Sequence, residues 1–148
     1  MKIITKNEKA TFNFAKKFAE SLQGGEIIGL IGDLGAGKTV FTEGLAAGLG
    51  VKNIVNSPTF VIMKVYDIKK TTSRIKKLVH IDAYRLQSTA DLEVIGAQDY
   101  FNRLDTITVI EWIDKIKSDI PKKNLIALNF IHQDNDKRTI NYNRNKIN

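Results

Sequence analysis

An eight-residue segment near the start of the chain restricts the possible folds more than any other feature. Residues 32–39 read Gly-Asp-Leu-Gly-Ala-Gly-Lys-Thr, which matches G-x-x-x-x-G-K-T, the phosphate-binding loop of nucleoside triphosphatases. The glycines allow the backbone to curl until successive N–H groups point at phosphate oxygens. Lys38 would place its ammonium on the β- and γ-phosphates, and the Thr39 hydroxyl would hold Mg²⁺. The motif therefore predicts a strand, a loop and a helix in that order.

The sequence on both sides of the motif fits this order. An apolar run at 26–31 precedes it, as a buried strand requires. After it, apolar residues recur at helical spacing and glycines end the segment: Phe41, Leu45, Ala46, Leu49, Gly48 and Gly50. A glycine-rich turn with an incidental lysine is disfavoured by these flanks. We expect ATP to contact the loop and the start of the helix, at Asp33, Leu34, Gly35, Ala36, Gly37, Lys38, Thr39 and Val40.

The length and composition indicate one domain, residues 1–148. A chain of 148 residues that is 43% hydrophobic can bury one core. Its apolar runs are too short to span a bilayer, and its first residues lack the apolar stretch of a signal peptide. The absence of cysteine excludes disulfides and thiolate metal sites. We therefore expect a cytoplasmic protein with no membrane association.

The net charge of +7 has two interpretations. A basic protein attracts phosphate backbones, so an anionic partner such as RNA is one of them. A general bias toward lysine, isoleucine and asparagine, which also favours solubility, is the other. Composition alone leaves both open.

The remaining pattern predicts an α/β fold with a mixed sheet. We expect an amphipathic helix over 8–22, and two strands, 60–66 and 77–81, joined as a hairpin by a basic turn. Further along, we expect a helix, a buried strand, a short helix and a final pair of strands, at 91–101, 107–110, 112–118, 125–131 and 139–142. The strands near the nucleotide should be mostly parallel, with antiparallel additions, as in a three-layer phosphate-loop NTPase.

Two acidic residues each follow a predicted strand, as the metal site of such a protein requires. Asp82 follows one buried strand and Glu111 follows another. Because the carboxyl ends of parallel strands gather near the phosphates, either residue can supply the second metal ligand or act in catalysis. A helix cap or a surface ion pair is the alternative for each. Their spacing does not rank them.

Other candidates have weaker patterns. The segment 57–60, Ser-Pro-Thr-Phe, lies where GTPase-like proteins keep a switch loop, so the Thr59 hydroxyl can approach Mg²⁺; taken alone, an ordinary turn is favoured. His80 is either a base near the phosphates or, more often for such a residue, a packed histidine. Arg85 either neutralises phosphate or binds a carboxylate. Trp112 either lies near the nucleotide or belongs to the core.

Taken in order, these motifs resemble the TsaE family, also called YjeE. The similarity rests on the phosphate loop, the 57–60 segment, His-Ile-Asp-Ala-Tyr-Arg-Leu at 80–86, the segment 91–101 and Glu-Trp at 111–112. It covers residues from about 8 to 112. Each later motif is weak alone, whereas the whole ordered set is specific.

The resemblance implies a bacterial Mg²⁺-dependent ATPase that helps to form threonylcarbamoyladenosine next to the anticodon of tRNA, together with TsaD and TsaB. It implies that Lys38 contacts phosphates, that Thr39 and Glu111 bind Mg²⁺, and that Asp82 lies near the metal and the attacking water. Two positions depart from the family pattern. Val40 replaces a frequent hydroxyl residue, and Ile113 replaces a frequent proline.

Two other functions remain open on sequence grounds. A small-molecule kinase would share the phosphate loop, although no arginine-rich lid segment follows the core. A nucleotide-gated RNA-binding protein without turnover is the other alternative. It is motivated by a basic turn that contains Lys69, Lys70, Arg74, Lys76 and Lys77.

Overall fold

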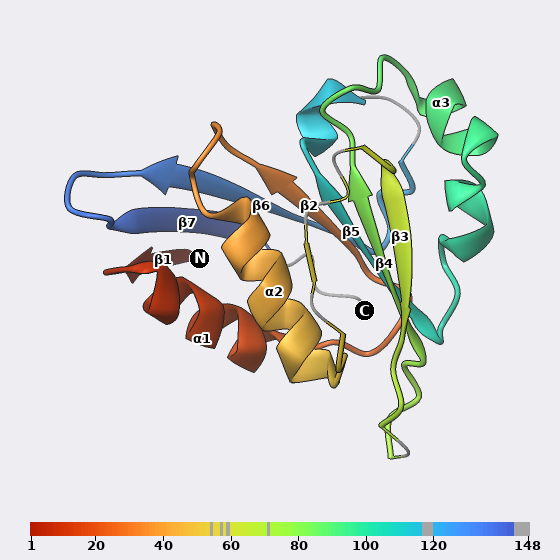
Figure 1. The fold of residues 1–148 in the computed structure, drawn as a ribbon, viewed down its shortest axis with the longest axis horizontal. Coiled ribbons are helices and arrows are strands. Elements are labelled where there is room, and N and C mark those ends of the chain that lie inside the picture. Colours follow the sequence, from red (N-terminus) through yellow and green to blue (C-terminus); the bar gives the residue numbers. More distant parts are fainter. Residues whose placement is uncertain (54, 57, 59, 71, 117–119, 144–148) are drawn as a thin grey trace.

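The computed structural model describes residues 1–143 apart from positions 54, 57, 59, 71 and 117–119. The chain forms one mixed α/β arrangement (Figure 1). In chain order, its elements are β1 (Lys2–Thr5), α1 (Glu8–Ala19), β2 (Ile27–Ile31), α2 (Lys38–Leu49), β3 (Met63–Asp67), β4 (Lys77–Asp82), α3 (Thr89–Val94), the 3₁₀ helix η1 (Ala97–Tyr100), β5 (Thr106–Glu111), the 3₁₀ helix η2 (Ile113–Lys115), β6 (Leu125–His132) and β7 (Arg138–Asn143). None of these helices is long and apolar enough to cross a membrane.

The seven strands form one sheet in the order β1-β7-β6-β2-β5-β4-β3. The four central strands, β6, β2, β5 and β4, are parallel to one another. The outer pairings, β3 with β4, β7 with β6 and β1 with β7, are antiparallel. The prediction of parallel strands at the centre with antiparallel additions is therefore confirmed. The carboxyl ends of the four central strands lie at the same edge, which is where loop side chains can converge.

Helices cover both faces of this sheet. Helices α1 and α2 pack on one face around a cluster in which Phe41 lies 5.7 Å from Phe18 and 5.5 Å from Phe130, measured between ring centroids. Short helices cover the other face, where Leu92 and Ile113 pack against β-strand residues. The alternation follows from the strands, since successive side chains of a buried strand point to opposite faces. The predicted three layers are thus present.

Several element boundaries differ from the sequence predictions, and most have a local backbone cause. The predicted helix 91–101 is divided into α3 and η1, because Gly96 adopts a left-handed conformation with φ 75°. Strand β3 begins only at Met63, after Ile62 with φ 69°. The predicted helix 112–118 is reduced to η2, which starts after Trp112 with φ 59°; positions 117–119 lie outside the described residues.

Strand β1 was not predicted. Its residues carry no alternating apolar pattern, and the strand exists because its backbone pairs with β7 along Lys2–Thr5. In contrast, the two hairpins that the sequence predicted, β3–β4 and β6–β7, are both present.

Close packing of α1 on α2 depends on two glycines of α2. A Cβ atom on Gly44 would collide with the backbone carbonyl oxygen of Phe12, and one on Gly48 would collide with the carbonyl oxygen of Lys16. The two helices therefore approach until backbone touches backbone. This contact fixes the position of α2, whose first turn carries Lys38 and Thr39.

We expect Gly44→Ala to destabilise the protein, although alanine is the better helix former. Helix propensity alone would stabilise the variant by about 1 kcal/mol. The collision with α1 should instead cost about 1–3 kcal/mol through displaced backbone. Urea unfolding should therefore show a net loss of unfolding free energy. A stabilised variant would show that α1 and α2 can separate without cost.

Candidate functional site

The loop between β2 and α2 owes its shape to its glycines. Gly32, Gly35 and Gly37 have φ values of 150°, 78° and 103°, a region that other residues rarely adopt. A Cβ atom on Gly37 would also lie 2.6 Å from Nε of Arg138. The loop therefore curls tightly over the first turn of α2. It lies next to the free backbone N–H groups that begin that helix.

The ammonium of Lys38 is enclosed by this loop. Its Nζ atom donates hydrogen bonds to the carbonyl oxygens of Gly32 and Asp33, at 2.5 and 2.8 Å. It also lies 4.0 Å from the ring centroid of Trp112, as a cation–π contact requires. Only 5% of the residue is exposed, and this burial lowers the pKa of Lys38, against the opposing effect of nearby Glu111. The loop therefore holds a poorly hydrated cation in a fixed place.

The carboxylate of Glu111 lies between Thr39 and His80. Glu111 ends β5, and its Oε1 atom lies 2.8 Å from Nε2 of His80. The Thr39 hydroxyl donates long hydrogen bonds of 3.5 and 3.4 Å to the two carboxylate oxygens. His80 is completely buried inside β4. Of the two roles considered for it, a base near the phosphates or a packed histidine, the structure favours the packed histidine. Its ring contacts the Glu111 carboxylate from within the sheet.

Asp82 lies beside Glu111, because the two residues pair in the register of β4 and β5. Its Oδ1 atom accepts the backbone N–H of Tyr84 at 2.9 Å, which fixes the side chain at the strand end. Both acids are buried. The fold thus brings together the two carboxylates that spacing could not rank. It makes Glu111 the neighbour of Thr39.

These groups face a cavity of about 430 Å³, a volume in the usual range for small-molecule sites. Most of the predicted contact residues line it, together with three that were not predicted: Leu34, Gly35, Gly37, Lys38, Thr39, Val40, Asp82, Glu111 and Trp112, with Glu8, Tyr84 and Arg138. Asp33 and Ala36 belong to the same loop but do not line the cavity. Instead, the Ala36 N–H donates to the Asp33 carbonyl oxygen at 3.0 Å, which closes a turn within the loop.

Arg138 and Glu8 are the main residues that sequence reasoning missed. Arg138 begins β7 and is 3% exposed; its NH2 atom lies 3.5 Å from the carboxylate of Glu8, at the start of α1. Among the described residues, its Nε atom has no hydrogen-bond partner. Neither residue belongs to a recognisable motif. Only the pairing of β7 with β6 and β1 brings Arg138 next to the loop, beside Gly37.

The remaining candidates have different positions. Ser57 and Thr59 lie outside the described residues, so the predicted switch loop and its contact with Mg²⁺ stay predictions. Arg85 is exposed, and its guanidinium lies 5.2 Å from the ring centroid of Phe60 rather than in the cavity. Trp112 does belong to the site, because its ring contacts Lys38 and lies 5.0 Å from the ring of Tyr84.

The donor set fits a cation that shares its ligands with a bound molecule. Within the described part of the chain, no group of three His, Cys, Asp or Glu side chains could hold a metal ion by itself. Magnesium does not need such a cage, since it usually binds one or two carboxylates plus substrate phosphates and water. Thr39 and Glu111 offer a hydroxyl and a carboxylate beside a helix N-terminus that favours anions. The residues present therefore fit a magnesium–phosphate ligand.

Comparison with known proteins gives consistent matches over nearly the whole chain. The family described as "Threonylcarbamoyl adenosine biosynthesis protein TsaE" matches residues 5–140. A TsaE protein of Borreliella burgdorferi is 41% identical over 125 residues, which cover 84% of this chain and 87% of that protein. One from Treponema pallidum is 33% identical over 141 residues, or 95% and 99% of the two chains. Both carry the name "tRNA threonylcarbamoyladenosine biosynthesis protein TsaE".

A solved structure agrees with this assignment. The crystal structure of YdiB from Bacillus subtilis superposes with a TM-score of 0.77 at 32% sequence identity, and covers 96% of this chain and 83% of its own. The matched region includes the loop that encloses Lys38 and the strand ends that carry Asp82 and Glu111. The resemblance inferred from the ordered motifs is thus confirmed, and the chain belongs to the TsaE family of threonylcarbamoyl adenosine biosynthesis proteins.

Proposed function

We propose that this protein is a cytoplasmic Mg²⁺-dependent ATPase that acts in the formation of threonylcarbamoyladenosine in tRNA. The pathway follows from the family, whereas the ATPase activity rests on one observation. A buried lysine, a threonine hydroxyl and a buried glutamate meet at the mouth of a curled glycine loop, inside one cavity. This combination suits a nucleoside triphosphate with its metal.

Phosphate binding follows from the environment of Lys38. The ammonium is held by two neutral carbonyl groups and an aromatic face, which compensate a buried charge less well than an anion does. Phosphate oxygens can replace these partners while the N–H groups of the loop and the α2 N-terminus bind the same anion. The ammonium and the N–H groups that would bind a triphosphate therefore already lie together in the structure without a ligand.

The acids account for metal binding and hydrolysis. When bound, Mg²⁺ neutralises charge that develops on the β- and γ-phosphates. Thr39 and Glu111 are the residues that would hold it, and the hydrogen bond from His80 keeps the Glu111 carboxylate directed toward Thr39. Asp82, on the neighbouring strand end, can orient a water molecule or a metal-bound water. His80 is thus a positioning residue, and Glu111 and Asp82 are the proposed catalytic acids.

Lys38→Ala should remove tight ATP binding. The ammonium is the one cationic side chain supplied by the loop motif, and charge-assisted hydrogen bonds are worth roughly 1.5–3 kcal/mol. The dissociation constant for Mg·ATP, measured by calorimetry, should therefore rise about tenfold or more. Unfolding curves should confirm that the variant is folded. A folded variant with unchanged affinity would contradict the proposed phosphate site.

Glu111→Gln should abolish ATP hydrolysis while ATP still binds. Glutamine keeps the size of the side chain but removes the anionic ligand that Mg²⁺ prefers. His80→Leu leaves that carboxylate in place but removes its hydrogen bond, so it should lower the rate less and raise the magnesium concentration required for half-maximal activity. Steady-state assays over a magnesium series would measure both effects. Normal turnover by Glu111→Gln, with Asp82→Asn inactive, would reverse our assignment of the two acids.

We further propose TsaD-like and TsaB-like proteins as partners that dock at the cavity edge. Support comes from exposed apolar side chains on loops at the carboxyl ends of the central strands, since Leu34, Phe60 and Tyr84 are 90%, 87% and 54% exposed. Large exposed apolar groups around a site commonly mark protein interfaces. A partner at this edge could order the site or complete it.

Co-purification with and without ATP, followed by rate measurements, tests this proposal. The isolated protein should hydrolyse ATP slowly, and the complex faster. Groups supplied in trans raise turnover by up to ~10³–10⁵ in other phosphate-loop proteins, which sets an upper bound. Equal rates with and without the two partners would refute activation. Phe60→Ser with Val61→Ser should weaken the complex, and calorimetry should show that the double variant still binds ATP, because neither exposed side chain lines the cavity.

A further inference from the structure

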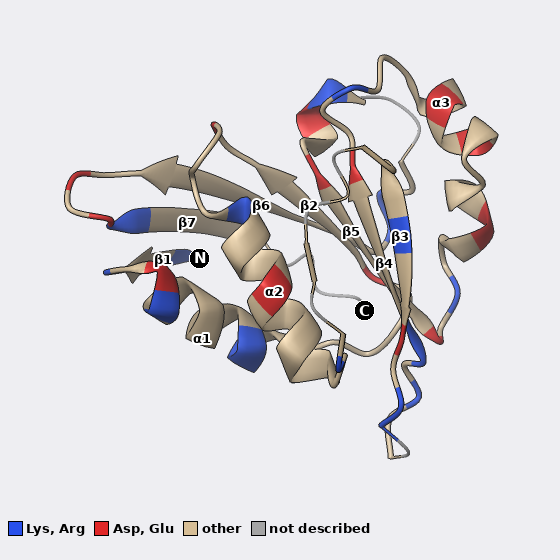
Figure 2. Cartoon of the chain, viewed as in Figure 1, with Lys and Arg blue, Asp and Glu red and all other residues tan. Residues whose placement is uncertain are grey.

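Basic residues gather on loops at the amino ends of the central strands (Figure 2), and the cavity lies at the carboxyl ends. Four loops meet at the amino ends through main-chain hydrogen bonds and the side chain of Arg74. The 68–76 turn contacts the 101–105 loop through the hydrogen bond from Lys76 N–H to the Asp105 carbonyl, at 2.7 Å. The 120–124 loop adjoins the start of β2, where Ile27 N–H donates to Asn124 O at 3.0 Å. The 20–26 loop joins them through Gln23, whose carbonyl oxygen accepts from Arg74 NH2 at 2.5 Å.

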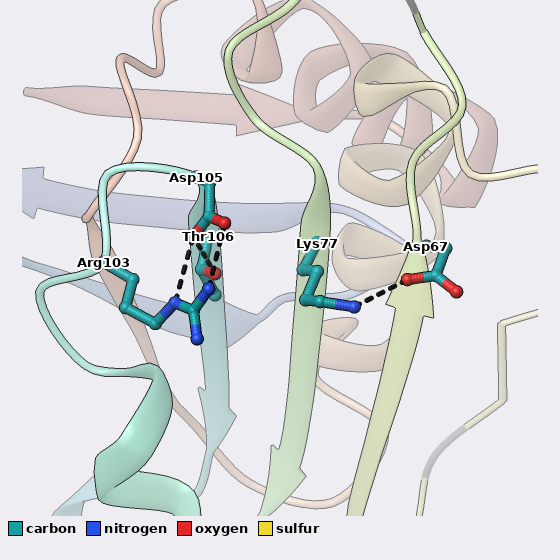
Figure 3. A network of polar contacts seen from close by, with 5 residues as sticks. All are labelled: Asp67, Lys77, Arg103, Asp105 and Thr106. Atoms are coloured by element: carbon teal, nitrogen blue, oxygen red, sulfur yellow. Dashed lines mark hydrogen bonds and ion pairs between the residues drawn. The ribbon is translucent and has the colours of Figure 1, made fainter.

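Some of these cations already have partners within the protein. Lys77 lies 2.8 Å from the carboxylate of Asp67, and Arg103 lies 3.1 Å from that of Asp105 (Figure 3). Arg74 donates to a backbone carbonyl and ties the turn to the 20–26 loop. These three cations therefore stabilise the loops, and two of them neutralise the nearby acids.

The other cations of this end are less fully compensated: Lys69 acts on Asp67 without a salt bridge, and the pKa of that carboxyl is lowered mainly by Lys77. We define the basic surface as six exposed lysines that form no salt bridge in the described part of the chain: Lys52, Lys69, Lys70, Lys76, Lys122 and Lys123. The Nζ atom of Lys76 donates to the carbonyl oxygen of Lys70 at 3.4 Å, and the side chain of Lys70 lies beside Gly50, two residues before Lys52. The loop contacts thus hold cations from separate parts of the sequence together on one surface.

We propose that this basic surface binds the phosphate backbone of a folded RNA, and that tRNA is the RNA concerned. The choice of tRNA rests on the proposed function, whereas the choice of a phosphate backbone rests on the surface itself. Interfaces between proteins are depleted in lysine and need an apolar core. Here the exposed apolar side chains Leu34, Phe60 and Tyr84 lie at the opposite edge. In the described part of the four basic-end loops, Leu104, 58% exposed, is the one large exposed apolar side chain, too little for such a core. Nucleic-acid interfaces are polar and strongly positive, and lysines commonly contact phosphates.

The location has a functional consequence. The ATP cavity occupies the carboxyl ends of the central strands, so RNA at the amino end would not compete with the nucleotide or with a partner docked at the cavity. Contacts with phosphates alone would give little sequence preference and a strong dependence on salt.

The test is the binding of an unmodified, fluorescein-labelled tRNA transcript to the full-length protein, measured by anisotropy between about 50 and 200 mM salt. The triple variant Lys69→Glu, Lys70→Glu and Lys76→Glu should bind at least tenfold more weakly than the wild type. Its plot of log affinity against log salt should be shallower by about two, because each phosphate contact contributes roughly 0.7–0.9 to the slope. Its affinity for Mg·ATP should not change, which separates this proposal from the proposed ATPase site.

The matched control is Lys6→Glu, Lys9→Glu and Lys137→Glu, which makes the same change in net charge near the opposite, carboxyl ends of the central strands, where β1 ends, α1 begins and β7 begins. These lysines are exposed and form no salt bridge among the described residues. The control should lose less than threefold in tRNA affinity. If both variants lost the same affinity for tRNA, the loss would be explained by net charge alone, and the proposal would be overturned. So would undetectable wild-type binding at 50 mM salt, or a triple variant that binds tRNA normally but loses the TsaD–TsaB pair.

Discussion

The enclosed ammonium of Lys38 is the interaction on which most of the structure depends. A buried cation is costly unless polar groups surround it, and here carbonyl oxygens of the loop and the face of Trp112 do so. The carbonyls can point inward only because glycines allow the loop to curl. The helix that carries Lys38 is held close to the sheet by its backbone contact with α1 at Gly44. Parallel pairing of β5 with β2 then delivers Glu111 to the same place.

The electrostatics of this edge favour a ligand with both signs of charge. Burial lowers the pKa of Lys38, so the cation gains from any anion that replaces neutral carbonyl partners. One helical turn after Thr39, outside the cavity, burial raises the pKa of Glu43, and the charges of Glu8 and Glu111 raise it further. Carboxylates that repel one another across a small space gain from a cation between them. The magnesium nucleotide that we propose as the ligand carries an anion and a cation in one molecule, which would suit a cavity that combines an enclosed lysine with buried carboxylates.

The parts of the site that lie close together along the chain could be predicted from the sequence. So could the general rule that acids at the ends of neighbouring strands lie near one another. The loop from Gly32 to Thr39 could be identified because its function requires fixed spacing. Asp82 and Glu111 could be nominated but not ranked, because the choice depends on which one lies across from Thr39, and that follows from strand order. Arg138 could not be identified, since an antiparallel strand at the far end of the chain brings it to the loop. Helix lengths were overestimated where a single residue, Gly96 or Trp112, turned the backbone into the left-handed region.

The net charge of +7 does not show that the two ends of the sheet carry different kinds of side chain. At the carboxyl ends, acids and apolar side chains surround one enclosed lysine, a composition suited to a nucleotide and a protein partner. At the amino ends, Lys77 and Arg103 pair with acids of the surface loops (Figure 3), whereas the six lysines of the basic surface form no salt bridge among the described residues. If both proposals hold, the common direction of the central strands would place the phosphate backbone of an RNA and the triphosphate of ATP at opposite ends of one sheet, so that both could bind together.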